Sequence, residues 1–319
     1  MIDYNRISHS KMLSLTNNID NVVVKATNFN DFDSIINFLK DIVKNNNIVE
    51  RVRGNNKNAP LNIVDMCSGS GVFGIALAKV LGGKGIIHFV DIVGEYHETA
   101  INYTELILGN NYEPITHTSS AESTSIPDNS IDIILEVNGF HHVPSLSKAV
   151  RESERILKTD GLFLGLDRIH ENNVSDQQLN ALLDAEYSSA WLKEYNYVDQ
   201  KLTRRENGEG EIRLLEWEHA LINANFEDPL LIEYVNRCKR SYKVWLISNL
   251  PEKFSKLFLD FWIKPPKWSL RLLVTMIFGI SIGKKSNRSK IVTAKFPKNV
   301  NSTIVRMEVI ISSKNKNNL

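Results

Sequence analysis

Short apolar runs and stretches of helical periodicity alternate through the middle of the chain. The runs are nearly continuous, as in strands that are buried on both faces of a parallel sheet. The expected strands cover residues 61–64, 86–90, 115–119, 131–137 and 162–166, and the expected helices cover 72–80, 96–107 and 145–158. Their order predicts an α/β fold with a doubly wound, mostly parallel seven-stranded sheet and helices on both faces.

One large domain with an extension on each side is expected. The parts are an N-terminal helical segment with a polar linker (1–59), the domain itself (60–249) and a C-terminal extension (250–319). Residues 168–214 are charged and mostly helical in pattern, and their place after the fifth strand predicts a helical cover insertion over the strand ends. Residues 230–234 and 244–247 are expected to close the sheet, and 303–311 to form a terminal hairpin with 291–296.

A glycine-rich turn joins the first expected strand to its helix. Residues 64–74 read VDMCSGSGVFG, so the strand ends near Asp65 before the turn opens the helix. Asp91 ends the next strand, twenty positions after Gly71. Glycines let a backbone approach a ligand closely, and an acid at this place can accept hydrogen bonds from two ribose hydroxyls. This order predicts nucleotide binding at the carboxyl ends of the strands.

The charge of Asp65 separates two ligand classes. Gly69, Gly71 and Gly74 fit the GxGxxG spacing of NAD-binding domains, so a dinucleotide is one candidate. A carboxylate beside the turn repels a pyrophosphate, however, and favours a ligand with an ammonium and a sulfonium group. S-adenosylmethionine (SAM) is such a ligand. A purely structural role for Asp65 as a cap of the turn remains open.

The stretch 64–74 resembles motif I of the Rossmann-like, class I SAM-dependent methyltransferases, especially the ubiquinone/menaquinone type that acts on small molecules. Cys67 stands where the wider motif has its first glycine. The resemblance implies that Asp65, Gly69 and Gly71 hold the methionine end of SAM and that Asp91 holds the ribose. The full set of expected cofactor-binding residues is Asp65, Cys67, Gly69, Ser70, Gly71, Asp91, Ile92, Ala121, Glu122 and Glu136.

Two acids in this set have structural alternatives. The stretch around Ala121 and Glu122 resembles the adenine-binding loop of the family, although Glu122 could equally be an exposed loop residue. Glu136 lies late in the fourth strand, where a buried acid needs a partner. It is expected either to face the pocket or to pair with a basic side chain.

Residues 137–144 read VNGFHHVP and follow the fourth strand, where open α/β sheets bind ligands. His141 and His142 are therefore candidate catalytic residues, because a histidine can take up a proton near neutral pH. The alternative is that one of them, His142 first, packs beneath the next helix. The loop lacks the Asn/Asp-Pro-Pro-aromatic sequence of methyltransferases that modify base amino groups, which argues against methylation of nucleic-acid amino groups.

These features predict an enzyme that transfers the SAM methyl group to an oxygen or carbon of a small organic molecule, with a lipophilic acceptor left open. An NAD(P)-dependent oxidoreductase and a non-catalytic SAM-binding module are the alternatives. Cys67 and Cys238 are the only cysteines and form no metal motif, so no metal site is expected.

Charge is uneven along the chain, although the formal net charge is +1. Residues 251–319 contain 14 Lys and Arg against 3 Asp and Glu, and lysines surround aromatic residues over 251–290. Peripheral contact of this segment with an anionic membrane, packing on the core and a homodimer contact are all open. The start of the chain lacks the apolar core of a signal peptide, and the longest apolar run is about half a membrane span, so a cytoplasmic location is expected.

Overall fold

A computed structural model describes most of the α/β unit. The residues that it describes are 31–56, 58–194, 201–226, 230–234 and 307–313, with Ile19, Phe29 and Tyr197. They belong to a unit formed by residues 1–234 and 305–319, whereas residues 235–304 are assigned to a second unit. The expected strands 244–247 and 291–296 and the expected membrane-contact segment 251–290 lie outside the described residues.

Eight strands form the central sheet in the described part of the chain, and seven of them follow the order β3-β2-β1-β4-β5-β8-β7. Their bounds are β1 Leu61–Met66, β2 Gly85–Asp91, β3 Tyr112–Thr118, β4 Ile131–Val137, β5 Leu157–His170, β6 Ile212–Arg213, β7 Leu230–Tyr234 and β8 Met307–Ser313. Strands β1 to β5 pair in parallel, the short β6 pairs in parallel with the end of β5, and β8 runs antiparallel to β5 and β7. The strand order reverses between β1 and β4, which is where such sheets bind ligands.

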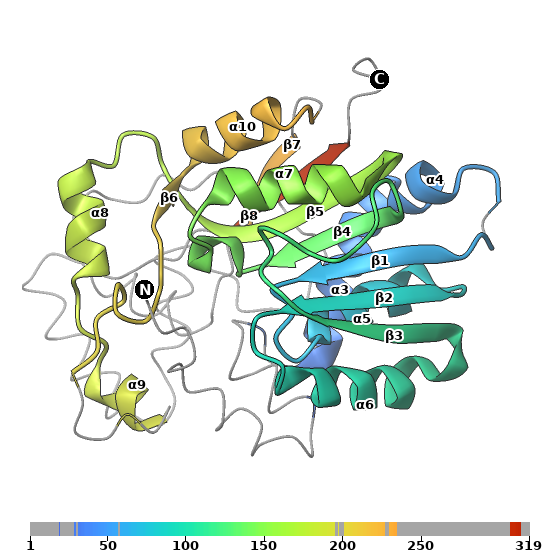
Figure 1. Cartoon of the computed structure of the whole chain (residues 1–319), viewed down its shortest axis with the longest axis horizontal. Helices are drawn as coiled ribbons and strands as arrows, with labels where there is room; N and C mark the ends of the chain where they lie inside the picture. The colour runs from blue at the N-terminus through green and yellow to red at the C-terminus, as the bar shows by residue number, and fades with distance from the viewer. Residues whose placement is uncertain are drawn as a thin grey trace, which may run out of the picture. The chain divides into compact units, whose positions relative to one another are not determined.

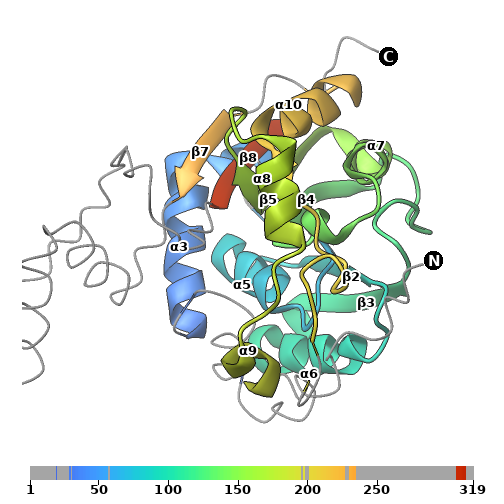
Figure 2. The same cartoon turned by 90° about the vertical axis from the view of Figure 1, so that its left-hand side faces the viewer.

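Helices flank both faces of the sheet (Figure 1, Figure 2). Their bounds are α3 Phe32–Asn45, α4 Ile48–Arg53, α5 Val72–Leu81, α6 Tyr96–Leu108, α7 Leu146–Ile156, α8 Asp176–Leu183, α9 Ser189–Glu194 and α10 Leu214–Asn223, with short 3-10 helices η2 Gly109–Asn111 and η3 Phe140–His142. Among the described helices, none combines the length and the apolar character that crossing a bilayer requires. The predicted α/β class with a parallel sheet and flanking helices is confirmed.

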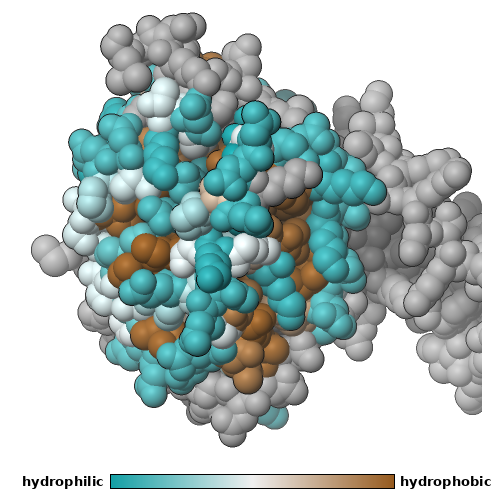
Figure 3. All heavy atoms as spheres, turned by 90° about the vertical axis from the view of Figure 1, so that its right-hand side faces the viewer, coloured by the Kyte–Doolittle hydropathy of each residue, from teal (hydrophilic) through white to brown (hydrophobic). Residues whose placement is uncertain are grey.

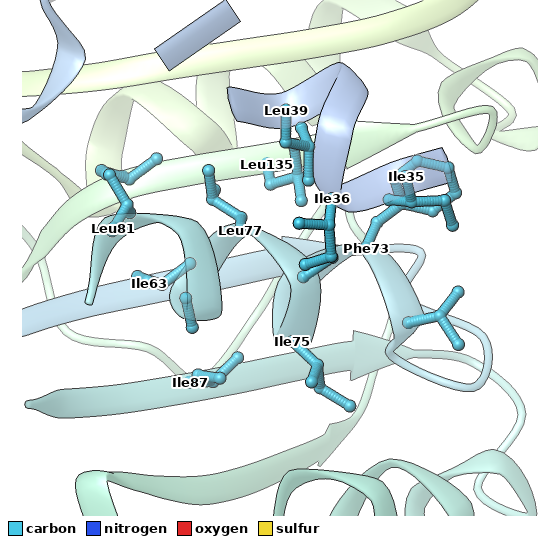
Figure 4. Packing of buried hydrophobic residues seen from close by; sticks show 14 of the residues in the cluster. Ile35, Ile36, Leu39, Ile63, Phe73, Ile75, Leu77, Leu81, Ile87 and Leu135 are labelled. Carbon is cyan, nitrogen blue, oxygen red and sulfur yellow. The ribbon is translucent and has the colours of Figure 1, made fainter. Parts of the chain in front are cut away.

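Two hydrophobic clusters lie on opposite faces of the sheet, because successive side chains of a strand point to opposite sides. Leu61 and Ile63 of β1 enter the cluster that contains α3, α5 and α6 (Figure 4). Val64 and Met66 of the same strand enter the cluster that contains α7 and α10. On the face shown in Figure 3, the described surface is mostly hydrophilic, with apolar residues in separate small groups.

The N-terminal helix is part of this core. Asp31 caps α3 as predicted, since its carboxylate accepts a hydrogen bond of 2.7 Å from Ser34 N. Helix α3 packs on α5 and buries its apolar face there. Arg53 at the end of α4 donates to Leu81 O at 2.8 Å and to Gly82 O at 2.7 Å. Residues before the first strand therefore help to hold α5, the helix that the glycine-rich turn opens.

The last strands of the sheet are arranged differently from the expectation. The strand expected at 303–311 does form, as β8, but it lies between β5 and β7 in the central sheet instead of in a separate terminal hairpin. A domain boundary at 249 would leave this strand outside the domain. Tyr234, the last residue of β7, pairs with Met307, the first residue of β8. Residues 235–306 are thus an insertion between two paired antiparallel strands.

This pairing gives a test of the domain organisation. Replacing residues 235–306 with an Asn-Gly turn should preserve the sheet, because a two-residue turn joins directly opposed antiparallel positions. The shortened chain should unfold cooperatively on heating, as followed by circular dichroism. A chain that ends at Asn249 should aggregate or lose this transition, because β5 and β7 then lack the strand between them. An unchanged melting temperature for the chain that ends at Asn249 would contradict the assignment of β8.

Candidate functional site

The turn after β1 has the backbone geometry that the glycine motif predicts. Cys67, Gly69 and Gly71 have φ values of 53°, 50° and 74°. Glycine adopts this left-handed region most readily, which explains why a glycine suits the position of Cys67. A Cβ on Gly71 would lie 2.6 Å from Phe89 Cε1, whereas a Cβ on Gly69 would meet nothing within 4 Å. Gly71 therefore serves close packing, and Gly69 faces open space where a ligand can approach the backbone.

Asp65 is buried beneath this turn, with 2% of its surface exposed. Its Oδ2 accepts a hydrogen bond of 2.9 Å from Gly74 N in the first turn of α5. A Cβ on Gly74 would lie 2.8 Å from the same oxygen, so the third glycine of the motif makes room for the carboxylate. The structural role left open for Asp65 is thus present. Burial, reinforced by the charge of Asp91, raises the pKa of Asp65 to about 8, although the Gly74 N–H opposes the shift.

Asp91 ties the turn to the end of β2. Its Oδ2 accepts from Gly69 N at 2.8 Å and its Oδ1 from Val93 N at 2.9 Å. Burial raises the pKa of Asp91, and the two N–H groups limit the rise. Ile92 is 46% exposed beside it, which suits an apolar contact with a ligand. Ser70, also in the expected cofactor set, is buried in the turn.

Several polar atoms near these strand ends have no hydrogen-bond partner among the described residues. They include Ser68 Oγ in the turn, His97 Nε2 at the start of α6 and Ser119 Oγ just after β3. Buried polar groups are nearly always paired, so a polar ligand or water is the expected partner here. Together with the open side of Gly69 and the two acids, these atoms fit an adenosyl ligand that carries positive charge.

The loop after β3 meets helix α7. Ala121 is buried in the core cluster of α7 and α10. Glu122 Oε1 accepts a hydrogen bond of 2.5 Å from the backbone N of Ser145, where α7 begins. The structure therefore gives Glu122 a helix-capping contact, and adenine binding by this residue stays a prediction.

Glu136 is fully buried in β4. Its Oε1 accepts from Gly139 N at 2.7 Å and from Phe140 N at 3.0 Å, so its partners are backbone groups and not the basic side chain considered above. Burial and the neighbouring charge of Asp167 raise the pKa of Glu136 well above its ordinary value. A Cβ on Gly139 would lie 2.4 Å from Cys67 Cβ, so this turn touches the turn after β1.

His141 forms a pair with an acid that the sequence analysis missed. Its Nδ1 lies 2.6 Å from Asp167 Oδ1, and the two side chains are 3% and 0% exposed. Asp167 Oδ1 also accepts from Arg168 N at 2.8 Å. A signal was present, because Asp167 directly follows an apolar run in β5, at the sheet edge where the fourth strand also ends. Among the described residues, the ring of His141 forms this one hydrogen bond, through Nδ1. Its Nε2 is therefore available to a bound substrate.

The neighbouring His142 has a different environment. Its ring lies beside that of His141, with 4.2 Å between the centroids. Burial, together with His141, lowers the pKa of His142 to about 3, so this ring is neutral at physiological pH. Among the described residues, a carboxylate orients the ring of His141 and none bonds to the ring of His142.

The insertion between β5 and β6 reaches the same place. It contains α8 and α9, which lie beyond the ends of β1 and β4 at the left of Figure 1. Its return segment contacts the loop after β4, where Gly210 N donates to His141 O at 2.6 Å. Its function as a cover for substrate stays a prediction.

Known proteins are similar to this chain in sequence. Residues 64–165 match the family described as methyltransferase domain. The chain is 31% identical over 170 residues to the ubiquinone/menaquinone biosynthesis C-methyltransferase of Rickettsia typhi, across 51% of this chain and 64% of that protein. It is 27% identical over 161 residues to the demethylmenaquinone methyltransferase of Leptospira interrogans, across 47% of this chain and 58% of that protein. The chain is therefore similar to methyltransferases over residues 64–165 and over about half of its length.

A solved structure agrees with this fold. It is a protein from Galdieria sulphuraria, provisionally assigned as a sarcosine dimethylglycine methyltransferase, with a TM-score of 0.50 at 14% identity and coverage of 88% of this chain and 85% of that one. The chain covers less than two thirds of the length of the two bacterial relatives. The similarity to methyltransferases supports SAM as the cofactor over the dinucleotide alternative.

The raised pKa of Asp65 gives a test of SAM recognition by this methyltransferase domain. In the free protein Asp65 is mostly protonated at pH 7, because its pKa is about 8. The positive charge of SAM should lower that pKa, so binding at pH 7 should release close to one proton. Calorimetric titrations in phosphate and Tris buffers, whose ionisation enthalpies differ, measure this release.

Asp65→Asn keeps an acceptor for Gly74 N but removes the charge. It should abolish the part of the proton release due to Asp65 and weaken SAM binding by about tenfold or more, since a hydrogen bond to a charged group contributes about 1.5–3 kcal/mol. Asp132→Asn is the matched control, because Asp132 pairs with Lys158 at 2.8 Å at the other end of β4. An Asp65→Asn variant with unchanged proton release and affinity would refute the role of the carboxylate.

Proposed function

We propose that this protein transfers the SAM methyl group to an oxygen or carbon of a small organic molecule, with His141 as the base. The observation that carries the proposal is the buried 2.6 Å contact between His141 Nδ1 and Asp167 Oδ1, next to the acidic glycine turn. The relatives that match this chain include a C-methyltransferase, which supports carbon among the acceptor atoms.

Bound SAM would supply an electrophilic methyl group that needs no further activation. The chain contributes the position of that group first: Asp65 and the open backbone at Gly69 would hold the methionine end, and Asp91 would hold the ribose. Such positioning is the main source of rate expected for a transfer between two bound molecules. The carboxylates of Asp65 and Asp91 would favour the positive charge of the cofactor.

His141 would remove the acceptor proton through Nε2. Asp167 accepts from the Nδ1 side, which fixes the ring orientation and the tautomer with a free lone pair on Nε2. As Nε2 takes up the proton, the ring becomes positive, and the carboxylate of Asp167 stabilises that charge. General-base assistance of this kind contributes about 10²- to 10⁴-fold to the rate.

A lipophilic acceptor remains part of this proposal. The sequence feature that suggests it, the aromatic and basic stretch 251–290, lies outside the described residues. Membrane contact, a cytoplasmic location and a homodimer are likewise proposals, tested by flotation with anionic vesicles, by fractionation and by light scattering of the full chain.

Substitutions at the histidine pair test the base. His141→Gln and Asp167→Asn should each lower kcat by about 10²- to 10⁴-fold. The SAM dissociation constant should change less than about threefold, because neither residue belongs to the proposed cofactor contacts. The assay follows S-adenosylhomocysteine release with the acceptor that a panel of phenols, carboxylic acids and 1,3-dicarbonyl compounds identifies.

His142→Gln is the matched control for this experiment. Its kcat should fall less than about tenfold, since a ring whose pKa is about 3 is a weak base at neutral pH. An equal loss from His142→Gln and His141→Gln would remove the special role of His141. SAM binding without turnover across the whole acceptor panel would favour the non-catalytic alternative.

A further inference from the structure

The return segment of the insertion contacts the backbone of His141, the proposed base. We use the name strap for residues 209–211. Gly210 N donates to His141 O at 2.6 Å, and a Cβ on Gly210 would lie 2.7 Å from the same oxygen. The strap therefore touches the backbone of the residue whose ring Asp167 orients.

A buried ionic network holds the strap against the end of β5. Arg168 Nη2 lies 2.9 Å from Glu209 Oε2, 3.2 Å from Gly210 O and 3.3 Å from Glu211 Oε1. The side chains of these two acids and of Arg168 are at most 10% exposed, so they are largely shielded from solvent. Arg204 pairs with Glu209 at 2.8 Å as well. Two arginines thus face two glutamates, and His170 also contacts Glu211.

Arg168 is also the residue that follows Asp167. Its backbone N donates to Asp167 Oδ1, the oxygen that contacts His141 Nδ1. One residue therefore contacts both the carboxylate that orients the ring and the strap that fixes the backbone. Breaking a buried ion pair by removing one partner leaves an unpaired buried charge. Movement of the strap away from Arg168 would carry this cost, so the ion pairs hold the strap in place.

We propose that the strap and Arg168 form a clamp that sets the position of the His141 ring for proton removal. Gly210 and Arg168 are then positioning residues that act through His141. The inference rests on the proposed function, since it assigns the clamp to the base of that reaction. The contact between Gly210 and His141 also makes the insertion part of the proposed active site. Through the strap, the insertion that contains α8 and α9 is connected to the base.

Gly210→Ala is the sharpest probe of the clamp. Gly210 is not among the glycines with a left-handed backbone, and the new Cβ would clash with His141 O at 2.7 Å. The variant should lower kcat by about tenfold to a hundredfold, because a displacement of about 1 Å in a catalytic group can cost a hundredfold. The SAM dissociation constant should change less than about twofold.

Arg168→Met should have the same effect, and Arg205→Met is its matched control. Arg205 lies on the same insertion, but it pairs with Asp184 at 2.8 Å where both side chains are about half exposed. Exposed pairs contribute about 0–1 kcal/mol to stability, so Arg205→Met should keep wild-type kcat. Thermal unfolding of each variant separates displacement of the base from loss of the fold.

A readout without turnover distinguishes failure of the clamp from failure of the proposed function. In protein labelled with ¹⁵N-histidine, the Nδ1 proton of His141 should give a downfield resonance that His141→Gln removes. Gly210→Ala and Arg168→Met should shift or broaden that resonance, and Arg205→Met should not. Wild-type resonance and kcat in folded Gly210→Ala would overturn the clamp. If Gly210→Ala and Arg168→Met alter the resonance but the wild-type protein methylates no acceptor, the clamp still positions the His141 ring, and the base role proposed for His141 is refuted.

Discussion

The cost of burying carboxyl groups at one sheet edge is the constraint to which the rest of the site responds. Asp65, Asp91, Glu136 and Asp167 end or nearly end four neighbouring parallel strands. Each is buried, and each accepts a hydrogen bond from a nearby backbone N–H group. The turns at this edge are shaped to supply these donors, and glycine at position 74 leaves space for a carboxylate. A cationic ligand beside Asp65 and Asp91 would offset part of the free energy that these carboxylates lose when they leave water.

Local patterns predicted much of this edge. Apolar runs predicted the strands from β1 to β5, because a strand buried on both faces leaves a continuous signal. The glycine spacing predicted the turn, and Asp31 predicted the start of α3, because both depend on residues a few positions apart. Cys67 in a positive-φ conformation shows why glycine suits its position in the motif. The choice of SAM over a dinucleotide followed from one charge, that of Asp65.

Contacts between distant segments could not be predicted in the same way. Asp167 lies 26 residues from His141, and the strap lies farther still along the chain. The sequence shows charged residues in the insertion but not which of them meet, since Arg168 and Glu209 are neighbours only after folding. The same holds for β8, whose apolar pattern predicts a strand but carries no signal for its place between β5 and β7. Glu122 and Glu136 were recognised as important acids, while their backbone partners depend on turns formed elsewhere.

The place of β8 has a consequence for biosynthesis. Strand β5 and its parallel neighbours leave the ribosome early, yet their antiparallel neighbour is encoded after residues 235–306. At translation rates of about 5–20 residues per second, the nascent sheet waits on the order of 10 seconds with an unpaired edge. Open edges of this kind pair readily with other chains. The yield of folded protein would therefore depend on protection of this open edge during synthesis, for example by chaperones, and not on the stability of the folded state alone.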